Sequence, residues 1–332
     1  MRIIQDSLNE AISRAERALV ATHVNPDGDA VGSAAALAHI ALRRGADVRI
    51  LLGEGLPTAF AWLSLPAPCV QSLRELGAWT PDLLLLADCG DISRTEPDLR
   101  IKLKARGLPD GDWQGITFVT IDHHLSNGGF GDLNWVEASR SSTGELVGLL
   151  AEHMGIPLTG DLAEAVYLAL VSDTGNFSFA NTSSDTLALA ARLAAGGFDI
   201  ATFTAKYENT WNIAKMRLWG RLMTEIRLHA DGAVACSLIP KRYLDESGLT
   251  RADLDGFASW LRRLRGVRVG LLVREDSPSR CKISLRSVGD VNVNAIAALY
   301  GGGGHAAAAG AELALPPEAA AKKVLTDIAA RL

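Results

Sequence analysis

The chain has 332 residues, of which 48% are hydrophobic, and this is enough for two domains with sizeable cores. Its formal net charge of −5, from 33 Lys and Arg against 38 Asp and Glu, argues against a protein that binds long duplex nucleic acid through a broad basic surface, although a local pocket can still bind a small anion. The four cysteines form no CxxC pair and the apolar runs near the motifs are too short to cross a bilayer, so we expect a cytoplasmic protein with reduced thiols and no membrane segment.

The first half of the chain alternates helical and strand patterns. Residues 3–17 predict an amphipathic helix, and a buried strand at 18–24 ends at an Asn-Pro-Asp-Gly turn that leads into a helix at 29–44. Further strands are predicted at 46–52, 82–88 and 116–121, and further helices at 142–154, 160–171 and 183–196. Pro109–Asp112 reads as a surface loop. Strands separated by helices predict an α/β fold with a mostly parallel sheet and helices on both faces.

The second half has a different pattern. Residues 222–239 predict a hairpin with Asp231-Gly232 at its turn, and a second hairpin is predicted from 267–275 and 280–287. A helix is expected at 250–264, and a helix near 292–299, a glycine run, a strand and a terminal helix complete the chain. We therefore expect a first domain at 1–195, a linker or helix at 196–220 and a smaller α/β domain at 221–332.

Acidic and histidine side chains gather where predicted elements of the first half end. They follow three of the strands and the helix at 160–171, and they are His23, Asp27, Asp29, Asp88, Asp122, His123, His124 and Asp173. Sites in open parallel sheets form at the carboxyl ends of the strands, so these side chains should converge on one cleft. Any one of them could have a structural role, as Asp29 could at a helix N-cap, but the full set indicates a functional site.

A cluster with this many carboxylates requires cations, because closely spaced acidic groups repel one another and cannot all ionise alone. Mixed Asp and His ligands without cysteine suit Mn²⁺, Mg²⁺ or Co²⁺ better than structural zinc. Two such ions, about 3.5–4 Å apart, are a common arrangement for phosphoester cleavage. The pattern therefore predicts a two-metal phosphoesterase.

These residues resemble the motifs of the DHH phosphoesterase family. Asp122-His123-His124 is similar to the motif that gives the family its name, and the His23–Asp29 segment, Asp88 and Asp173 match its other motifs in order. The second half resembles the DHHA1 domain that accompanies it, with a glycine-histidine sequence at Gly301–His305. The two halves look most like the standalone NrnA-type members, which degrade oligoribonucleotides and dephosphorylate 3′-phosphoadenosine 5′-phosphate.

The resemblance implies a role for each residue of the first half. Two Mn²⁺ ions, or Mg²⁺ or Co²⁺ in their place, would be bound by His23 and Asp27, by Asp29, His123 and Asp173, and by Asp88 as the bridge between them. Asp122 would orient a histidine ligand through a hydrogen bond, and His124 would donate to the scissile phosphate. Arg94 is a further candidate for phosphate binding.

The resemblance also assigns substrate binding to the second half. Arg286 would form a forked pair with a phosphate or stack on a base, and the other contacts would come from Ser284, Ser287, the backbone of Gly302, Gly303 and Gly304, and His305. Taken alone, a glycine run also reads as a flexible linker. Two positions depart from the family pattern: Ala306–Ala309 follow the histidine where a basic residue is expected, and Ser178 stands where Arg is expected. Because both departures remove an expected positive charge, they leave the identity of the substrate open.

The leading hypothesis is a Mn²⁺-dependent hydrolase of short oligoribonucleotides, with phosphatase activity on 3′-phosphoadenosine 5′-phosphate as a second reaction. A cleft between two domains would limit the length of the substrate. A phosphodiesterase for cyclic di-AMP or pApA would use the same chemistry and is the alternative. A non-catalytic scaffold is the contrasting class, but it predicts missing ligands, and all six are present. The resemblance suggests a homodimer through the first domain, whereas the sequence leaves the oligomeric state, cleavage polarity and base preference open.

Overall fold

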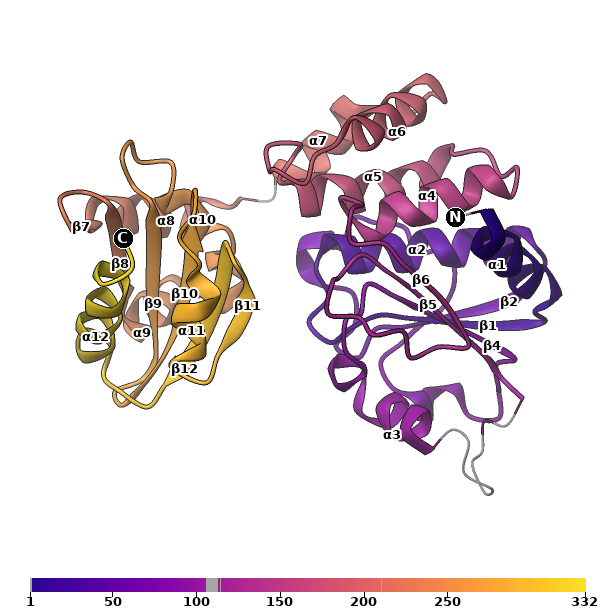
Figure 1. The fold of residues 1–332 in the computed structure, drawn as a ribbon, viewed down its shortest axis with the longest axis horizontal. Helices are drawn as coiled ribbons and strands as arrows, with labels where there is room; N and C mark the ends of the chain where they lie inside the picture. The colour runs from indigo at the N-terminus through magenta and orange to yellow at the C-terminus, as the bar shows by residue number, and fades with distance from the viewer. Residues whose placement is uncertain (1, 106–112, 114, 210) are drawn as a thin grey trace. The chain divides into compact units, whose positions relative to one another are not determined.

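The computed structural model of the protein describes residues 2–105, 113, 115–209 and 211–332 (Figure 1). The chain divides into two compact units, Met1–Thr210 and Trp211–Leu332. The stretch expected to be a linker is therefore shared between them, with α7 (Ile200–Glu208) in the first unit and α8 (Ile213–Thr224) in the second. The loop predicted at 109–112 lies outside the described residues.

The first unit is built on one parallel sheet, as predicted. Its strands are β1 (Arg17–Ala21), β2 (Asp47–Leu51), β3 (Cys69–Val70), β4 (Leu83–Ala87), β5 (Thr117–Asp122) and β6 (Leu133–Val136). They are arranged in the order β3-β2-β1-β4-β5-β6, and every neighbouring pair is parallel. The strand order reverses between β1 and β4, and in open α/β sheets the carboxyl ends at such a switch point form the ligand site.

Helices cover both faces of this sheet. One face carries α1 (Arg2–Arg14), α2 (Gly28–Arg43), α4 (Thr143–His153) and α5 (Gly160–Thr174), and the other carries α3 (Pro97–Ala105). The helix α6 (Ser184–Ala195) packs on α5. The strand β4 is a run of leucines that is buried throughout, as expected for a central strand covered on both sides.

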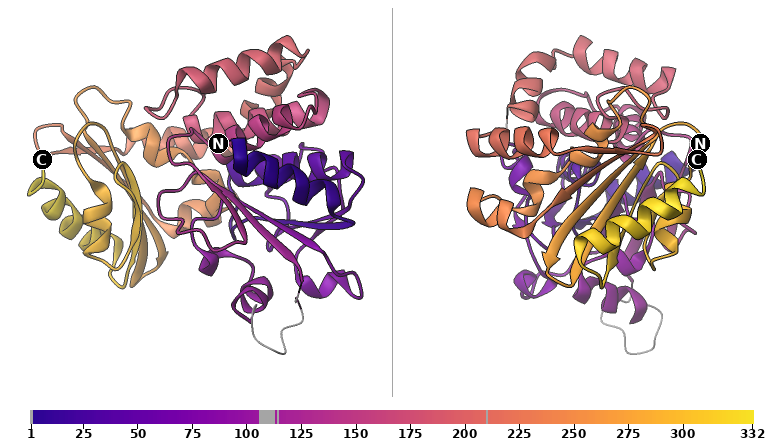
Figure 2. Two further views of the ribbon diagram at one scale, coloured as in Figure 1. Left: turned by 45° about the vertical axis from the view of Figure 1, so that its right-hand side comes forward. Right: turned by 90° about the vertical axis from the view of Figure 1, so that its left-hand side faces the viewer.

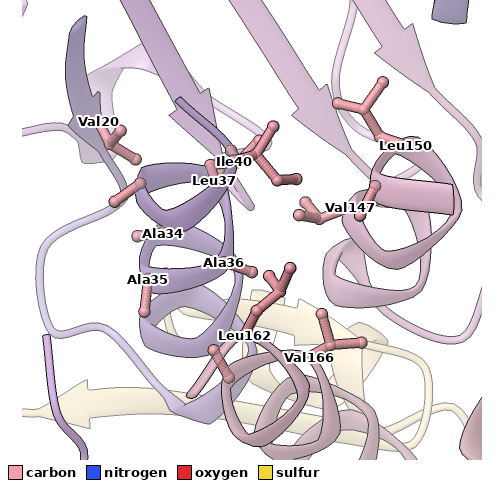
Figure 3. Packing of buried hydrophobic residues seen from close by; sticks show 14 of the residues in the cluster. Val20, Ala34, Ala35, Ala36, Leu37, Ile40, Val147, Leu150, Leu162 and Val166 are labelled. Atoms are coloured by element: carbon pink, nitrogen blue, oxygen red, sulfur yellow. The ribbon is translucent and has the colours of Figure 1, made fainter. Parts of the chain in front are cut away.

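Small residues allow α2, α4 and α5 to approach one another closely (Figure 3). A Cβ atom at Gly32 of α2 would lie 2.5 Å from the carbonyl oxygen of Ala165, and one at Gly144 of α4 would lie 2.1 Å from the Cβ of Ala169. Real Cβ atoms do not make such contacts, so only glycine fits at both positions. Within the described ranges no single helix is long and apolar enough to span a bilayer. The helices α6 and α7 have the required length and composition only when taken together, and the chain bends by 111° between them.

The second unit has a mixed sheet in the order β11-β12-β10-β9-β8-β7. Its strands are drawn in orange and yellow in Figure 2. Its strands are β7 (Arg227–His229), β8 (Val234–Ile239), β9 (Val269–Ser277), β10 (Arg280–Ser287), β11 (Gly303–His305) and β12 (Ala308–Leu313). Only β8 and β9 pair in parallel, and both predicted hairpins are confirmed as β7–β8 and β9–β10. One face carries α8, α9 (Lys241–Ser247) and α10 (Phe257–Leu261), and the other carries α11 (Val293–Ala298) and α12 (Pro317–Ala329).

The helix predicted at 250–264 is wrong in its extent. The chain forms a 3₁₀ turn at Arg251–Leu254 and then the short α10, which begins only at Phe257. Gly256 between them adopts a left-handed backbone, with φ of 86°. A residue in this conformation cannot continue a right-handed helix, so the apolar periodicity is divided between two turns.

Candidate metal centre

The predicted ligands come from three strand ends and one helix end. His23 follows β1, Asp88 follows β4 and His123 follows β5, all at the carboxyl edge of the sheet beside its switch point. Asp173 lies in the last turn of α5. The turn after β1 also forms the N-terminus of α2, where the Asp27 carboxylate caps the helix by accepting from the N–H groups of Asp29 and Ala30, each at 3.1 Å.

The structure brings all six predicted ligands together. His23, Asp27 and Asp88 form one group whose ligand atoms lie within 4.8 Å of one another, and Asp29, His123 and Asp173 form a second such group. His123 reaches both groups, because its Nε2 lies 3.1 Å from Oδ2 of Asp173 and 3.7 Å from Oδ1 of Asp88. The other oxygen of Asp88 lies 3.7 Å from Nε2 of His23, so this carboxylate is shared between the groups.

Both histidines of these groups present the same nitrogen to the carboxylates. Nδ1 of His23 lies 2.8 Å from the carbonyl oxygen of Val24, and Nδ1 of His123 lies 3.2 Å from that of Arg140. A carbonyl only accepts, so Nδ1 carries the proton in each ring and Nε2 has a lone pair directed into the cluster. Nε2 of His123 is buried and forms no hydrogen bond among the described residues, because at 3.1 Å it faces Oδ2 of Asp173 as one acceptor facing another.

The electrostatics of the cluster fit a divalent cation. Asp29 is fully buried, and burial together with the charges of Asp88 and Asp173 raises its pKa well above the usual value. Cys89, next to the bridging carboxylate, donates its thiol to the carbonyl of Asp91 and lies outside both groups. The donors of the cluster are oxygens and imidazole nitrogens without thiolate, and its carboxylates repel one another. A hard or borderline divalent ion would satisfy these donors, including the buried Nε2 of His123.

The role expected for Asp122 needs a correction. Its Oδ1 lies 2.8 Å from Nδ1 of His124 and accepts the backbone N–H of the same residue at 3.0 Å, while Oδ2 accepts from Asn127 at 2.8 Å. Asp122 therefore orients His124 rather than a histidine of the two ligand groups. The bonds to Asp122 and Asp88 raise the pKa of His124 to about 10, which favours the protonated ring.

The N-terminus of α4 is a part of the site that the sequence analysis missed. The N–H groups of Thr143 and Gly144 donate to the two oxygens of Asp29 at 2.8 and 2.9 Å, and the Thr143 hydroxyl donates to Oδ1 of Asp88 at 3.0 Å. A helix N-terminus favours a carboxylate through its unpaired N–H groups and its dipole. The Ser-x-x-Glu pattern at Ser142–Glu145 is a signal that could have located this helix end.

Arg94 is an exposed residue beside the first ligand group. It ends a short 3₁₀ turn at Ile92–Arg94, and its carbonyl accepts the N–H of Val24 at 2.7 Å. Its Nη2 lies 3.2 Å from Nδ1 of His23, but Nδ1 carries its proton toward the Val24 carbonyl, so this is a contact between two donors and not a hydrogen bond. A role in phosphate binding stays a prediction for this residue.

In the second unit, the predicted substrate residues on β10 fall on opposite faces of the strand. Ser284 and Arg286 share a partly exposed face, and Nη1 of Arg286 donates to the carbonyl of Leu285 at 2.9 Å. Ser287 lies on the buried face, where its hydroxyl donates to the carbonyl of Val291 at 2.6 Å. Its only hydrogen is used there, so the expected donation from Ser287 to a substrate is wrong.

The glycine run is an ordered part of the second sheet, and not a linker. A Cβ atom at Gly302 would lie 2.2 Å from the carbonyl of Gly310, and one at Gly304 would lie 2.4 Å from that of Ala308. These two glycines therefore let β11 approach β12. Gly303 and His305 are exposed on the edge strand β11.

Comparison with known proteins agrees with the resemblance seen in the motifs. The sequence matches the family model of the DHH family, N-terminal domain, over residues 17–170 and that of the DHHA1 domain over residues 231–331. It is 30% identical over 297 residues to the bifunctional oligoribonuclease and PAP phosphatase NrnA of Thermus thermophilus, covering 89% of this chain and 83% of that protein. The protein of the same name from Bacillus subtilis is 30% identical over 330 residues, or 98% of this chain and 97% of that one. The crystal structure of an exopolyphosphatase-related protein from Bacteroides fragilis is similar with a TM-score of 0.89 at 25% identity, covering 99% and 97% of the two chains.

Proposed function

The chain belongs to the DHH family, with a DHHA1 domain in its second half, and from this premise we propose that it is a cytoplasmic phosphoesterase that hydrolyses short oligoribonucleotides to mononucleotides and 3′-phosphoadenosine 5′-phosphate to AMP. The observation that carries the proposal is the pair of ligand groups that Asp88 joins: it belongs to the first group, and its Oδ1 lies 3.7 Å from Nε2 of His123 in the second. The names of the relatives from two bacteria supply the substrate class.

The ligand groups indicate which residues hold the cations. One ion would be held by His23 and Asp27, the other by Asp29, His123 and Asp173, with Asp88 between them. Mn²⁺ is the ion we propose, with Mg²⁺ or Co²⁺ as substitutes. When bound, such a pair neutralises charge on phosphate oxygens and activates water near neutral pH.

Two further residues act on the phosphate itself in this proposal. The His124 imidazolium, held by Asp122, donates from Nε2 to a phosphate oxygen and stabilises the charge that develops as the ester bond breaks. Arg94 adds positive charge at the exposed side of the first ligand group.

The second domain would bind the rest of the substrate. Arg286 and Ser284 offer a guanidinium and a hydroxyl on one face of β10, and Gly303 and His305 offer a backbone and an imidazole on the edge strand. Burial lowers the pKa of Arg286, because the charged guanidinium is only partly solvated, and an anion would replace the missing water. We keep these four residues as substrate contacts and leave Ser287 out.

The test is a comparison of substrates with the purified full-length protein in Mn²⁺: a labelled RNA dinucleotide, an RNA 24-mer, 3′-phosphoadenosine 5′-phosphate and cyclic di-AMP. We expect the highest kcat/KM on the dinucleotide, measurable release of phosphate from the bisphosphonucleoside, and little cleavage of the 24-mer. A preference for the 24-mer would contradict the short-substrate assignment. Faster cleavage of cyclic di-AMP than of the linear dinucleotide would favour the alternative phosphodiesterase.

Replacing Arg286 tests the role of the second domain. Arg286→Ala should raise KM for nucleotides about 10-fold or more, because a forked contact to phosphate is worth about 1.5–3 kcal/mol, while hydrolysis of a minimal chromogenic phosphodiester is retained. Arg280→Ala is the matched control, since Arg280 lies on the same strand but is exposed and pairs with Glu312. Equal KM values for Arg286→Ala and the unmodified protein would remove Arg286 from the substrate site.

A further inference from the structure

A short segment outside the ligand set contacts three of the six ligands directly. We call residues 140–145, which lead into α4 and form its first turn, the bracing segment. Its Thr143 and Gly144 bind Asp29 through their N–H groups, and the Thr143 hydroxyl binds Asp88. The carbonyl of Arg140 accepts from His123 at 3.2 Å.

Asp173, the remaining member of the second ligand group, is tied to the same segment through Asn181. The side-chain amide of Asn181 donates to the carbonyl of Ser141 at 2.9 Å and to the carbonyl of Asp173 at 3.1 Å. The bracing segment thus touches, directly or through one amide, every residue of the second ligand group and the shared carboxylate of Asp88.

Glu145 fixes the conformation of this segment. Its Oε2 accepts from the Ser141 N–H at 3.0 Å, the Ser141 hydroxyl at 2.7 Å and the Thr186 hydroxyl at 3.0 Å, and its Oε1 accepts from Nη1 of Arg140 at 2.9 Å. The side chain is 1% exposed. Burial alone would raise the pKa of Glu145, but the bonds from Ser141 and Arg140 outweigh it and hold the pKa below its usual value.

The first ligand group is anchored in a different way. His23 is held by the carbonyl of Val24, and Asp27 is held by the N–H groups at the start of α2. Among the described residues, His23 and Asp27 form no hydrogen bond to the bracing segment, which reaches this group only at Asp88. The two groups therefore depend unequally on Glu145, although they share Asp88.

We propose that Glu145 is a positioning residue for the second ligand group, so that it sets the affinity for the cation at Asp29, His123 and Asp173 with little effect on the cation at His23 and Asp27. The inference rests on the proposed two-metal function. Residues that orient metal ligands without touching the metal typically change affinity by about 10–100-fold when removed. Glu145→Gln keeps the shape of the side chain but replaces one acceptor oxygen by an NH₂ group, which cannot accept from Ser141, Thr186 or Arg140.

The test is a Mn²⁺ titration of the metal-free full-length protein. Binding is measured by calorimetry and by the loss of the electron paramagnetic resonance signal of free Mn²⁺. We expect two ions to bind the unmodified protein. In Glu145→Gln, one binding step should weaken by about 10–100-fold while the other is unchanged. Glu152→Gln is the matched control, because Glu152 lies on the same helix, pairs with Arg192 at the surface and undergoes the same change of charge.

The outcomes separate this inference from the function it rests on. Equal weakening of both steps, or of neither, in a folded Glu145→Gln protein overturns the role of Glu145 and leaves the two-metal function standing. Binding of fewer than two ions by the unmodified protein overturns both. If Glu145→Gln does not fold, Thr186→Val removes one donor to the intact carboxylate. It should weaken the same single step by a smaller factor, and an unchanged pair of affinities in Thr186→Val overturns the inference.

Discussion

Asp88 combines a buried charge with an uncommon backbone conformation. Its φ is 52°, in the left-handed region, and its N–H donates to the carbonyl of Ile121 at 3.0 Å at the edge of the sheet. Residues other than glycine adopt this region rarely, and Asp and Asn do so most readily. The surrounding sheet therefore holds the carboxylate at one place between the two ligand groups.

Asp88→Asn separates the charge from the shape, because Asn also tolerates a left-handed backbone and can still accept from Thr143. We expect kcat on the dinucleotide and on 3′-phosphoadenosine 5′-phosphate to fall at least about 100-fold, since loss of a residue that only supports ligands already costs about 10–100-fold. Asp91→Asn is the control: it is the same change at an exposed cap three residues away. A kcat reduced less than tenfold in Asp88→Asn would argue against a bridging role.

Ser287 illustrates how a residue of the right chemistry can be structural. Ser287→Ala should leave KM for nucleotides unchanged and lower the free energy of unfolding by about 1–3 kcal/mol, because the buried carbonyl of Val291 loses its donor. Kinetics and chemical denaturation of the same preparation measure both quantities. A raised KM with unchanged stability would restore the substrate role that the buried position argues against.

The contact between α2 and α5 decides where two ligands lie, since α2 carries Asp29 and α5 carries Asp173. Gly32→Ala places a Cβ atom 2.5 Å from the Ala165 carbonyl, and overpacking of this kind typically costs about 1–3 kcal/mol. The helices must move apart, so we also expect weaker Mn²⁺ binding. Denaturation and metal titration of the variant check the two effects, and a variant as stable as the original would show that the helices can adjust freely.

Gly220 gives the opposite prediction for the same substitution. It lies inside α8, is exposed, and has no neighbour within 4 Å of an added Cβ atom. Gly220→Ala should therefore raise the free energy of unfolding by roughly 0.5–1 kcal/mol, because alanine loses less backbone entropy in a helix. Chemical denaturation measures the change. A loss of stability in Gly220→Ala would mean that the exposed face of α8 is packed in solution.

Element patterns explain what the sequence could predict. Apolar runs that stop at turn signals located β1, β4 and β5, and the parallel topology then brought their carboxyl ends together. The alternation along β10 could also have placed Ser287 on the face opposite Arg286, because successive side chains of a strand point to opposite sides.

Those sequence patterns could not predict contacts between elements that are distant in the sequence. Thr143 reaches Asp29 across 114 positions of sequence, and this depends on how closely α2, α4 and α5 pack. Asp122 bonds to His124 and not to the adjacent His123. This depends on the side-chain rotamers after β5, which a sequence periodicity does not predict. Spacing therefore located the ligands, whereas the residues that orient them required tertiary structure.

At the scale of the whole molecule, the two units have separate hydrophobic cores. Among the residues that the structure describes, two clusters of buried side chains lie within the first unit and two within the second. All six proposed metal ligands belong to the first unit. Metal binding should therefore stabilise the first unit directly, because an ion that binds only the folded form of a unit raises the free energy of unfolding of that unit.

Differential scanning calorimetry of the full chain should accordingly show two transitions, of which only one depends on Mn²⁺. A free ion concentration of about 100 times Kd at each site stabilises the unit by about 2.7 kcal/mol per ion, or about 5 kcal/mol for two ions, which corresponds to a rise in Tm of roughly 10–20 °C for a unit of this size, and EDTA should reverse it. The Gly220→Ala variant assigns the peaks, since it changes only the second unit and should raise only the metal-independent transition. Asp88→Asn should reduce the metal-dependent rise. A single transition that moves as a whole with Mn²⁺ would show instead that the two cores unfold together, and that binding energy from the ligand groups is transmitted to residues that hold no metal.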